Sequence, residues 1–317
     1  MMVWVLAALG LVILLLAGDA LVRGAVNLSL RLGVPALIVS LTIVAFGTSA
    51  PELLISIKAV LDQAPGIALG NVVGSNTANI LLVLGVPAML AHMHTSECDS
   101  RKTYIFMLAA SLLFIALAFL GVFTLLSGLV LLVALAAVLW DQLGEALSHR
   151  RNGAEAEAEL DGLEEADPDM PWWRIGIYLG LGLIGLPMGA NLLVENASII
   201  ARTYGVSDTV IGLTLVALGT SLPELATTVM AALRRQADVA LGNVIGSNMF
   251  NLLAIIGVAT LFGPIPVDPE FLRFDLWVML GASLLLVPFV FFRLDLNWRW
   301  GTALTALYVA YVGAVLM

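Results

Sequence analysis

Apolar residues fill the chain in long runs that short polar stretches separate. The runs have about the length, roughly 20 residues, that an α-helix needs to cross a hydrocarbon layer of about 30 Å. Alternation with a period of two, which is typical of strands in a membrane barrel, is not the pattern seen. The sequence therefore predicts an all-α polytopic membrane protein. We expect ten spans, at residues 3–32, 35–60, 66–91, 103–121, 124–147, 172–203, 208–233, 238–263, 272–292 and 298–316.

One stretch of sequence occurs twice. Residues 41–86 and 213–258 match at 24 of 46 positions without a gap. Each copy lies in a set of five predicted spans, and because five is odd, the second set enters the membrane from the opposite side. This predicts an inverted-topology repeat, an architecture of secondary transporters whose binding site lies near the membrane midplane. The expected parts are a first five-helix repeat at 1–148, a linker at 149–171 and a second five-helix repeat at 172–317.

Composition supports the membrane assignment and locates the charge. Hydrophobic residues make up 61% of the chain and charged residues 12%, against about 25% charged in soluble domains. The net charge of −9 lies almost wholly in residues 152–170, which hold eight acidic side chains and no basic one. This acidic segment resembles a solvated tether more than a folded part.

Basic residues set the expected orientation. If the N-terminus lies outside, eleven of the 14 Lys and Arg residues fall at the inner ends of spans. The positive-inside rule then places both termini outside and the linker 149–171 in the cytoplasm. We expect a multi-pass protein of the plasma (inner) membrane, functional as a monomer in the lipid bilayer, with no nucleic acid as a partner.

The cysteine and the histidines suggest neither redox chemistry nor a zinc motif. Cys98 is the single cysteine, so an internal disulfide is excluded. His92, His94 and His149 all lie in or beside loops, and their spacing fits neither a zinc site nor a proton relay. No cofactor is expected.

The repeated positions carry oxygen atoms inside an apolar surround. Pro51 and Pro223 should interrupt their helices and free the carbonyl four residues back, which membranes tolerate only beside a cavity. Thr48 and Glu52 are spaced i and i+4 and share a helix face, and the second copy repeats this pair. The same spacing joins Ser75 to Asn79. The predicted set of oxygen donors is Thr48, Glu52, Ser75, Asn79, Thr220, Glu224, Ser247 and Asn251, with backbone carbonyls near Ala45 and Ala217.

Oxygen donors without sulfur or imidazole suit hard cations, and Ca²⁺ takes six to eight of them. Glu52 and Glu224 would supply a charge of −2 that one Ca²⁺ cancels, and Na⁺ could use the same oxygens. Charged side chains at the bilayer centre are costly, so an empty site should reorient poorly and favour exchange over leak. The alternative is that the two glutamates only join helices through hydrogen bonds.

Two motifs occur twice in the same order, GTSxPE at 47–52 and 219–224, then GNxxGSNxx[ND] at 70–79 and 242–251. They resemble the motifs of the cation/calcium exchanger superfamily, in particular its sodium/calcium exchanger branch. The resemblance implies alternating access, in which spans one and six slide across a fixed core and several Na⁺ move against one Ca²⁺. It implies that Ca²⁺ is bound by Glu52, Glu224, Thr48, Thr220 and the carbonyls of Ala45 and Ala217. It implies that Na⁺ is held by the same glutamates with Ser49, Ser75, Asn79, Ser221, Ser247 and Asn251.

Other functions stay open at this point. Some members of the resembled family carry an aspartate where this chain has Asn251, which leaves the Na⁺ stoichiometry and K⁺ coupling unassigned. A Ca²⁺/H⁺ antiporter is the nearest alternative, although such relatives have a GNxxE pattern in place of GTSxPE. A passive channel would not need the inverted repeat. An intramembrane hydrolase is disfavoured because neither GxGD nor GxSG occurs, so we do not expect an enzyme.

Overall fold

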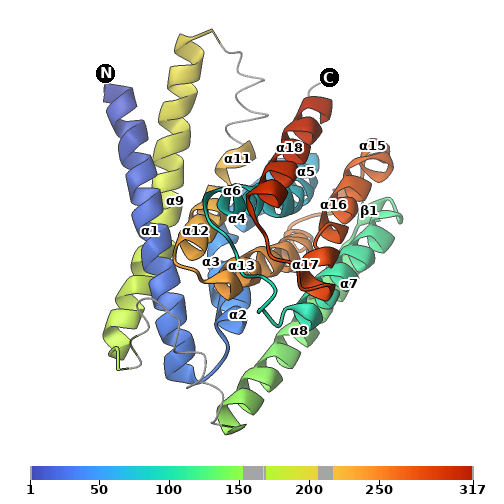
Figure 1. Ribbon diagram of the computed structural model, residues 1–317. Helices are drawn as coiled ribbons and strands as arrows, with labels where there is room; N and C mark the ends of the chain where they lie inside the picture. Colours follow the sequence, from blue (N-terminus) through green and yellow to red (C-terminus); the bar gives the residue numbers. More distant parts are fainter. Residues whose placement is uncertain (1, 153–166, 168, 206–216, 316–317) are drawn as a thin grey trace.

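A computed structural model describes residues 2–152, 167, 169–205 and 217–315 (Figure 1). The first half holds α1 (Met2–Leu32), α2 (Ala36–Val39), the π-helix η1 (Ser40–Val44), α3 (Ala45–Thr48), α4 (Ala50–Leu61), α5 (Pro65–Ala78), the π-helix η2 (Asn79–Val83), α6 (Gly85–Leu90), α7 (Arg101–Ala118), β1 (Val122–Phe123) and α8 (Leu125–Asn152). The second half holds α9 (Trp172–Thr203), α11 (Ala217–Gly219), α12 (Leu222–Leu233), α13 (Ala237–Met249), the π-helix η5 (Phe250–Ile255), α14 (Ile256–Ala259), β2 (Ile265–Pro266), α15 (Pro269–Arg273), α16 (Asp275–Leu284), α17 (Val287–Phe291) and α18 (Trp298–Val315).

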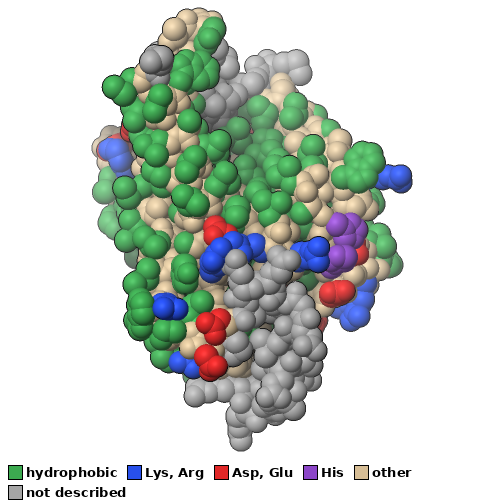
Figure 2. Space-filling model, turned by 60° about the vertical axis from the view of Figure 1, so that its left-hand side comes forward, with side chains coloured by type: hydrophobic (Ala, Val, Ile, Leu, Met, Phe, Trp, Pro, Cys, Tyr) green, Lys and Arg blue, Asp and Glu red, His purple; other side chains and the backbone are tan. Residues whose placement is uncertain are grey.

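The chain is an all-helical protein of many membrane spans. In its described part, seven helical segments are long and apolar enough to cross a membrane. The pair Ala36–Thr48 and Ala50–Leu61, bent by 42°, makes an eighth. Helices α12 and α18 are not among these, and residues 208–216 of the expected seventh span lie outside the described residues. Figure 2 shows hydrophobic side chains over most of one face, with charged side chains gathered toward its lower part.

Helices α1 and α9 lie side by side and antiparallel, at one edge of the molecule (Figure 1). Glycines let their backbones approach closely. A Cβ added at Gly189 would lie 2.7 Å from the backbone nitrogen of Leu14 and 3.0 Å from the carbonyl oxygen of Gly10. Such small-residue contacts are a common basis of helix pairing in membranes. The two helices therefore form one tightly packed unit.

An ion-pair cluster links this unit to the rest of the protein. On α1, the Nε of Arg23 lies 3.0 Å from an Asp19 carboxylate oxygen, and Arg234, at the end of α12, pairs with the other oxygen. A Cβ at Gly18 would lie 3.0 Å from the backbone of Ala226 in α12. Helix α1 thus contacts both α9 and the central helices.

Helix α13, with η5 and α14, runs through the centre of the protein, and residues 239–257 are all buried. Of the three π-helices among the described residues, two lie at repeated polar residues: η2 begins at Asn79, and η5 includes Asn251. A π-turn inserts an extra residue into the helix and is frequent at functional sites. The third, η1, leads directly into α3.

Short antiparallel contacts join the two halves outside the helices. In the β1–β2 ladder, Val122 pairs with Pro266 and Phe123 with Ile265. A single bridge joins Met93, in the loop after α6, to Leu296, in the loop before α18. Each contact links a loop of the first half to a loop of the second.

Candidate functional site

At each GTS motif one helix ends and a new helix begins. Helix α3 ends at Thr48, and α4 begins at Ala50 with Pro51 in its first turn. A proline in a first turn removes an N–H that has no helical partner in any case. The expectation that Pro51 interrupts its helix is therefore confirmed, with the break just before the proline, and the release of a backbone carbonyl stays a prediction. The N–H of Ser49 donates to the Ala45 carbonyl at 3.0 Å, and a new helix starts after it.

This break places each glutamate in the first turn of a helix. Glu52 is in the first turn of α4, and Glu224 is in the first turn of α12. Both side chains are buried, with 1% and 0% of their surface exposed. A helix N-terminus carries partial positive charge that favours a carboxylate there. Local structure thus stabilises two carboxylates that burial alone would penalise.

Polar side chains of the first copy contact the second copy directly. The Thr48 hydroxyl lies 3.4 Å from the Ser247 hydroxyl and donates to Oδ1 of Asn243 at 3.3 Å. The Ser49 hydroxyl lies 3.5 Å from Oε1 of Glu224. Residues nearly 200 positions apart are thereby brought to one place.

Four asparagines form a reciprocal network where α5–η2 meets α13–η5. Asn76 donates to the carbonyl of Asn248 at 3.2 Å, and Asn248 donates to the carbonyl of Asn76 at 3.4 Å. The Nδ2 of Asn79 donates to Oδ1 of Asn248, and the Nδ2 of Asn251 donates to Oδ1 of Asn76, both at 3.0 Å. The network therefore orients the amides of Asn79 and Asn251 by their nitrogen atoms.

Several oxygen atoms of these candidate ligands have no hydrogen-bond partner in the described structure. Both oxygens of Glu52, Oε2 of Glu224, and Oδ1 of Asn79 and Asn251 are buried and have no hydrogen-bond partner within the described structure. An unpaired buried acceptor costs about 1–3 kcal/mol, so five of them together would be a large penalty without a ligand. Carboxylate and amide oxygens are the donors that hard cations prefer. The arrangement fits a bound cation.

A second pair of asparagines braces the helices that carry the glutamates. Asn71 donates to the backbone carbonyl of Glu52 at 3.2 Å, and Asn243 donates to that of Glu224 at 3.4 Å. In each copy the same amide also donates to a hydroxyl one turn further along, at 3.1 Å. These amides hold the first turns of α4 and α12 against α5 and α13.

Comparison with known proteins identifies the family. The family model described as sodium/calcium exchanger protein matches residues 2–144 and 175–317. The chain belongs to the sodium/calcium exchanger family. This exchanger-family chain is 38% identical to the putative antiporter CaxA of Alkalimonas amylolytica over 290 residues, which covers 88% of the chain and 86% of that relative. It is 35% identical to the sodium/calcium exchanger MaX1 of Methanosarcina acetivorans over 335 residues, covering 96% and 95% of the two chains.

A solved structure of this family has the same fold. The sodium-calcium exchanger NCX_Mj, soaked with 2.5 mM Na⁺ and 0.1 mM Ca²⁺, superposes with a TM-score of 0.81 at 31% identity. The match covers 100% of this chain and 99% of NCX_Mj. The family model and the structure match together therefore cover both halves of this chain.

The remaining predicted ligands differ in their surroundings and in their burial. The carbonyl of Ala45 also accepts the Thr48 hydroxyl, at 3.3 Å, so a cation would compete with that hydroxyl. Ser75, Ser221 and Ser247 are buried, whereas Thr220 is half-buried. Ala217 is the first residue of α11, and its side chain lies outside the described residues.

Sequence reasoning gave the bracing and orienting asparagines no definite role. Recurrence in both copies was the one available signal, since each has its counterpart 172 positions away. What recurrence could not tell is that Asn76 and Asn248 exchange hydrogen bonds with each other. Their part in the site is to position the ligand amides.

Proposed function

We propose that the protein is a secondary antiporter that exchanges Na⁺ for Ca²⁺ by alternating access. The carrying observation is the group of five buried, unpartnered oxygens on Glu52, Glu224, Asn79 and Asn251. One Ca²⁺ would neutralise two carboxylates and complete these oxygens, and several Na⁺ could do the same in turn. Thr48, Ser49 and Ser247 would add hydroxyl oxygens, since Thr48 contacts Ser247 and Ser49 contacts Glu224.

Obligatory exchange follows from the charge. Insertion scales put the cost of one charged side chain at the membrane centre at about 2.5–3.5 kcal/mol. Moving an empty site with two ionised glutamates between the two faces of the membrane would incur such a cost twice. The loaded site has no such penalty, so the site should reorient only when cations occupy it.

The relatives support this assignment. The name of MaX1 describes a sodium/calcium exchanger, and NCX_Mj is a sodium-calcium exchanger of the same fold. Both match over nearly their whole length. We infer the same pair of transported ions for this chain.

We infer that the fold is an inverted repeat of five and five spans, with the site at the midplane between repeats 1–148 and 172–317. Reciprocal bonds between Asn76 and Asn248 support a local two-fold axis. The sulfur of Met107 lies 3.8 Å from the amide of Asn248, and that of Met279 lies 3.8 Å from the amide of Asn76. These methionines are also 172 positions apart. We propose both termini outside, the linker in the cytoplasm, a functional monomer and no cofactor.

Transport in proteoliposomes tests the proposal. Vesicles loaded with Na⁺ and diluted into Na⁺-free medium should accumulate Ca²⁺, and collapse of the Na⁺ gradient should stop the uptake. Equal uptake driven by a pH gradient alone would replace the Na⁺ assignment with Ca²⁺/H⁺ antiport. A strict requirement for K⁺ would make the exchange K⁺-dependent, and uptake without any counter-ion gradient would indicate a channel.

Glutamine variants test the site itself. Glu52→Gln and Glu224→Gln each keep the side-chain size but remove one charge, so Na⁺-driven Ca²⁺ uptake should be lost in both. Glu195→Gln makes the same chemical change at an exposed position on α9 and should transport as the unmodified protein does. Normal uptake by either site variant would remove that glutamate from the proposed mechanism.

A further inference from the structure

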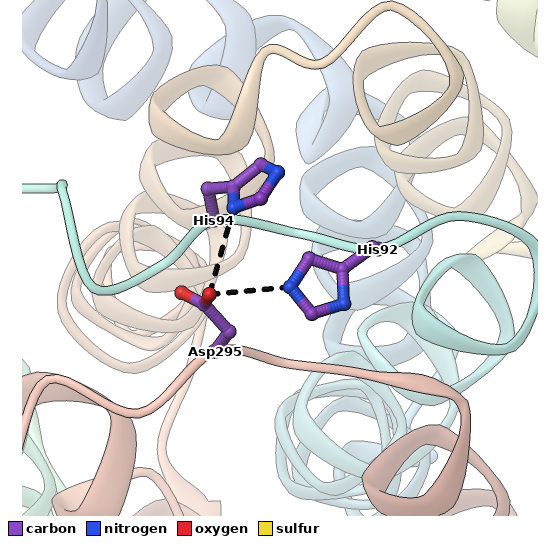
Figure 3. Close-up of side chains that lie close together, drawn as sticks. All are labelled: His92, His94 and Asp295. Carbon is purple, nitrogen blue, oxygen red and sulfur yellow. Dashed lines mark hydrogen bonds and ion pairs between the residues drawn. The ribbon is translucent and has the colours of Figure 1, made fainter.

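Three side chains that the proposed exchange site does not use lie together at a junction of two loops (Figure 3). His92 and His94 come from the loop between α6 and α7, and Asp295 comes from the loop between α17 and α18. The distance from His92 Nε2 to Asp295 Oδ2 is 3.1 Å, and that from His94 Nδ1 to the same oxygen is 3.5 Å. One ligand-type atom from each residue lies within 4.8 Å of the others.

Backbone pairing explains why these three residues meet. Met93 and Leu296 exchange two backbone hydrogen bonds, at 2.9 and 3.1 Å, in an antiparallel bridge. Successive side chains in extended backbone point to opposite faces. Met93 and Leu296 are buried, with 2% and 0% of their surface exposed, so their neighbours His92, His94 and Asp295 project outward on one face.

Neighbouring groups hold the carboxylate in a fixed orientation. The backbone N–H of Ser96 donates to Oδ1 of Asp295 at 3.0 Å, which leaves Oδ2 toward both imidazole rings. Thr95 strengthens the junction, because its hydroxyl donates to the Leu294 carbonyl at 2.8 Å and accepts the Leu296 N–H at 3.2 Å.

We propose that His92, His94 and Asp295 bind a divalent transition-metal ion of the Zn²⁺ type. Tetrahedral zinc bonds of about 2.0–2.2 Å separate ligand atoms by roughly 3.4 Å. The two distances to Asp295 already lie close to this value. Three protein ligands leave a fourth position for water, which makes the site open and exchangeable.

The donor set separates this site from the transported ions. Imidazole nitrogen suits Zn²⁺, Ni²⁺ and Cu²⁺, whereas Ca²⁺ and Na⁺ take oxygen donors. A metal bound here would join a loop of the first half to a loop of the second beside the Met93–Leu296 bridge. Since it binds the folded protein, it should also raise the unfolding temperature.

Metal titration of the purified, metal-free full chain tests the inference. Calorimetry should show one Zn²⁺ bound per chain, with an excess of Ca²⁺ unable to displace it, and Co²⁺ should give the visible absorption of a tetrahedral site. Loss of an outer-shell partner of a metal ligand alone costs 10- to 100-fold in affinity. The double variant His92→Ala/His94→Ala, which removes two ligands, should therefore lose more than about 100-fold.

The controls use matched changes elsewhere. His149→Ala removes the third histidine of the chain and should leave Zn²⁺ affinity unchanged, as should Glu52→Gln. Zn²⁺ should raise the unfolding temperature of the unmodified protein and of His149→Ala but not that of the double variant, whose metal-free unfolding temperature reports whether it folds. Unchanged Zn²⁺ binding by a folded double variant, or no binding by the unmodified protein, would overturn the proposal.

Discussion

Asn248 offers a sharp test of how the ligand amides are positioned. Its Oδ1 accepts the Nδ2 of Asn79 at 3.0 Å, and its own Nδ2 donates to the carbonyl of Asn76 at 3.4 Å. Asn248→Ala removes both contacts and leaves the backbone in place. The amide of Asn79 then loses the partner that keeps its oxygen unpaired and available for a cation.

The expected loss of cation affinity follows from the loss of one hydrogen bond, the 3.0 Å bond between Asn79 and Asn248. A buried donor left without its partner costs about 1–3 kcal/mol. If Asn79 turns to recover a bond, its oxygen leaves the site and the same free energy is lost from cation binding. The Na⁺ concentration for half-maximal Ca²⁺ exchange should therefore rise by about 5- to 150-fold.

The assay is Na⁺-dependent Ca²⁺ exchange in proteoliposomes, measured over a range of Na⁺ concentrations. Asn196→Ala is the matched control, because Asn196 is also buried and its amide donates, within the described residues, to the carbonyl of Leu192 in its own helix at 2.8 Å. The control should leave the half-maximal Na⁺ concentration within about twofold. An equally small change in Asn248→Ala would refute the view that Asn248 positions Asn79.

Two further predictions concern packing and charge, both measured by thermal unfolding of the purified protein. A Cβ at Gly246 would lie 2.6 Å from the Cβ of Ala45, so Gly246→Ala should destabilise by about 1–3 kcal/mol. Gly281→Ala, on α16 with open space around it, should not destabilise the protein. Equal unfolding midpoints for Gly246→Ala and Gly281→Ala would contradict the close packing at Gly246. Asp19→Asn should cost about 1–3 kcal/mol, because the Asp19 and Arg234 side chains are only 18% and 17% exposed. Asp62→Asn, in an exposed pair with Lys58, should cost less than about 1 kcal/mol, and a larger loss there than at Asp19 would contradict the argument.

Hydropathy and repetition in the sequence were sufficient to predict most helices and the family. Long apolar runs correspond closely to α1, α7, α8 and α9, since helix length in a membrane follows from its thickness. Hydropathy alone does not give the number of spans. Helix α18 begins with Trp298, Arg299 and Trp300. These interfacial residues lower its mean hydropathy, so it is not among the helices that are apolar enough to be assigned as membrane spans by composition.

Local geometry at the site was harder to predict. Pro51 indicated a break but not its position, because the same residue fits either the interior of a kinked helix or the first turn of a new one. The π-helices at Asn79 and Asn251 lie in stretches that are almost wholly apolar, so no change in hydropathy marks them in the sequence.

The contact between His92 and Asp295 could not be predicted from the sequence. His92 and Asp295 are 203 positions apart, so no spacing rule could combine them. They meet because of an antiparallel bridge that only the folded chain contains. The family resemblance implied that Ser49 and Glu224 share a site, whereas their direct contact comes from the structure.

The reciprocal asparagines have a consequence for biosynthesis. The half that is inserted first holds Asn76 and Asn79 in the membrane before their partners Asn248 and Asn251 have been made. Amides buried in lipid cannot form hydrogen bonds with water. The first half therefore lacks these hydrogen bonds until the second half is inserted and exchanges them with it. A chain truncated after the first half should therefore be incompletely folded, and the cell should handle it as a misfolded membrane protein.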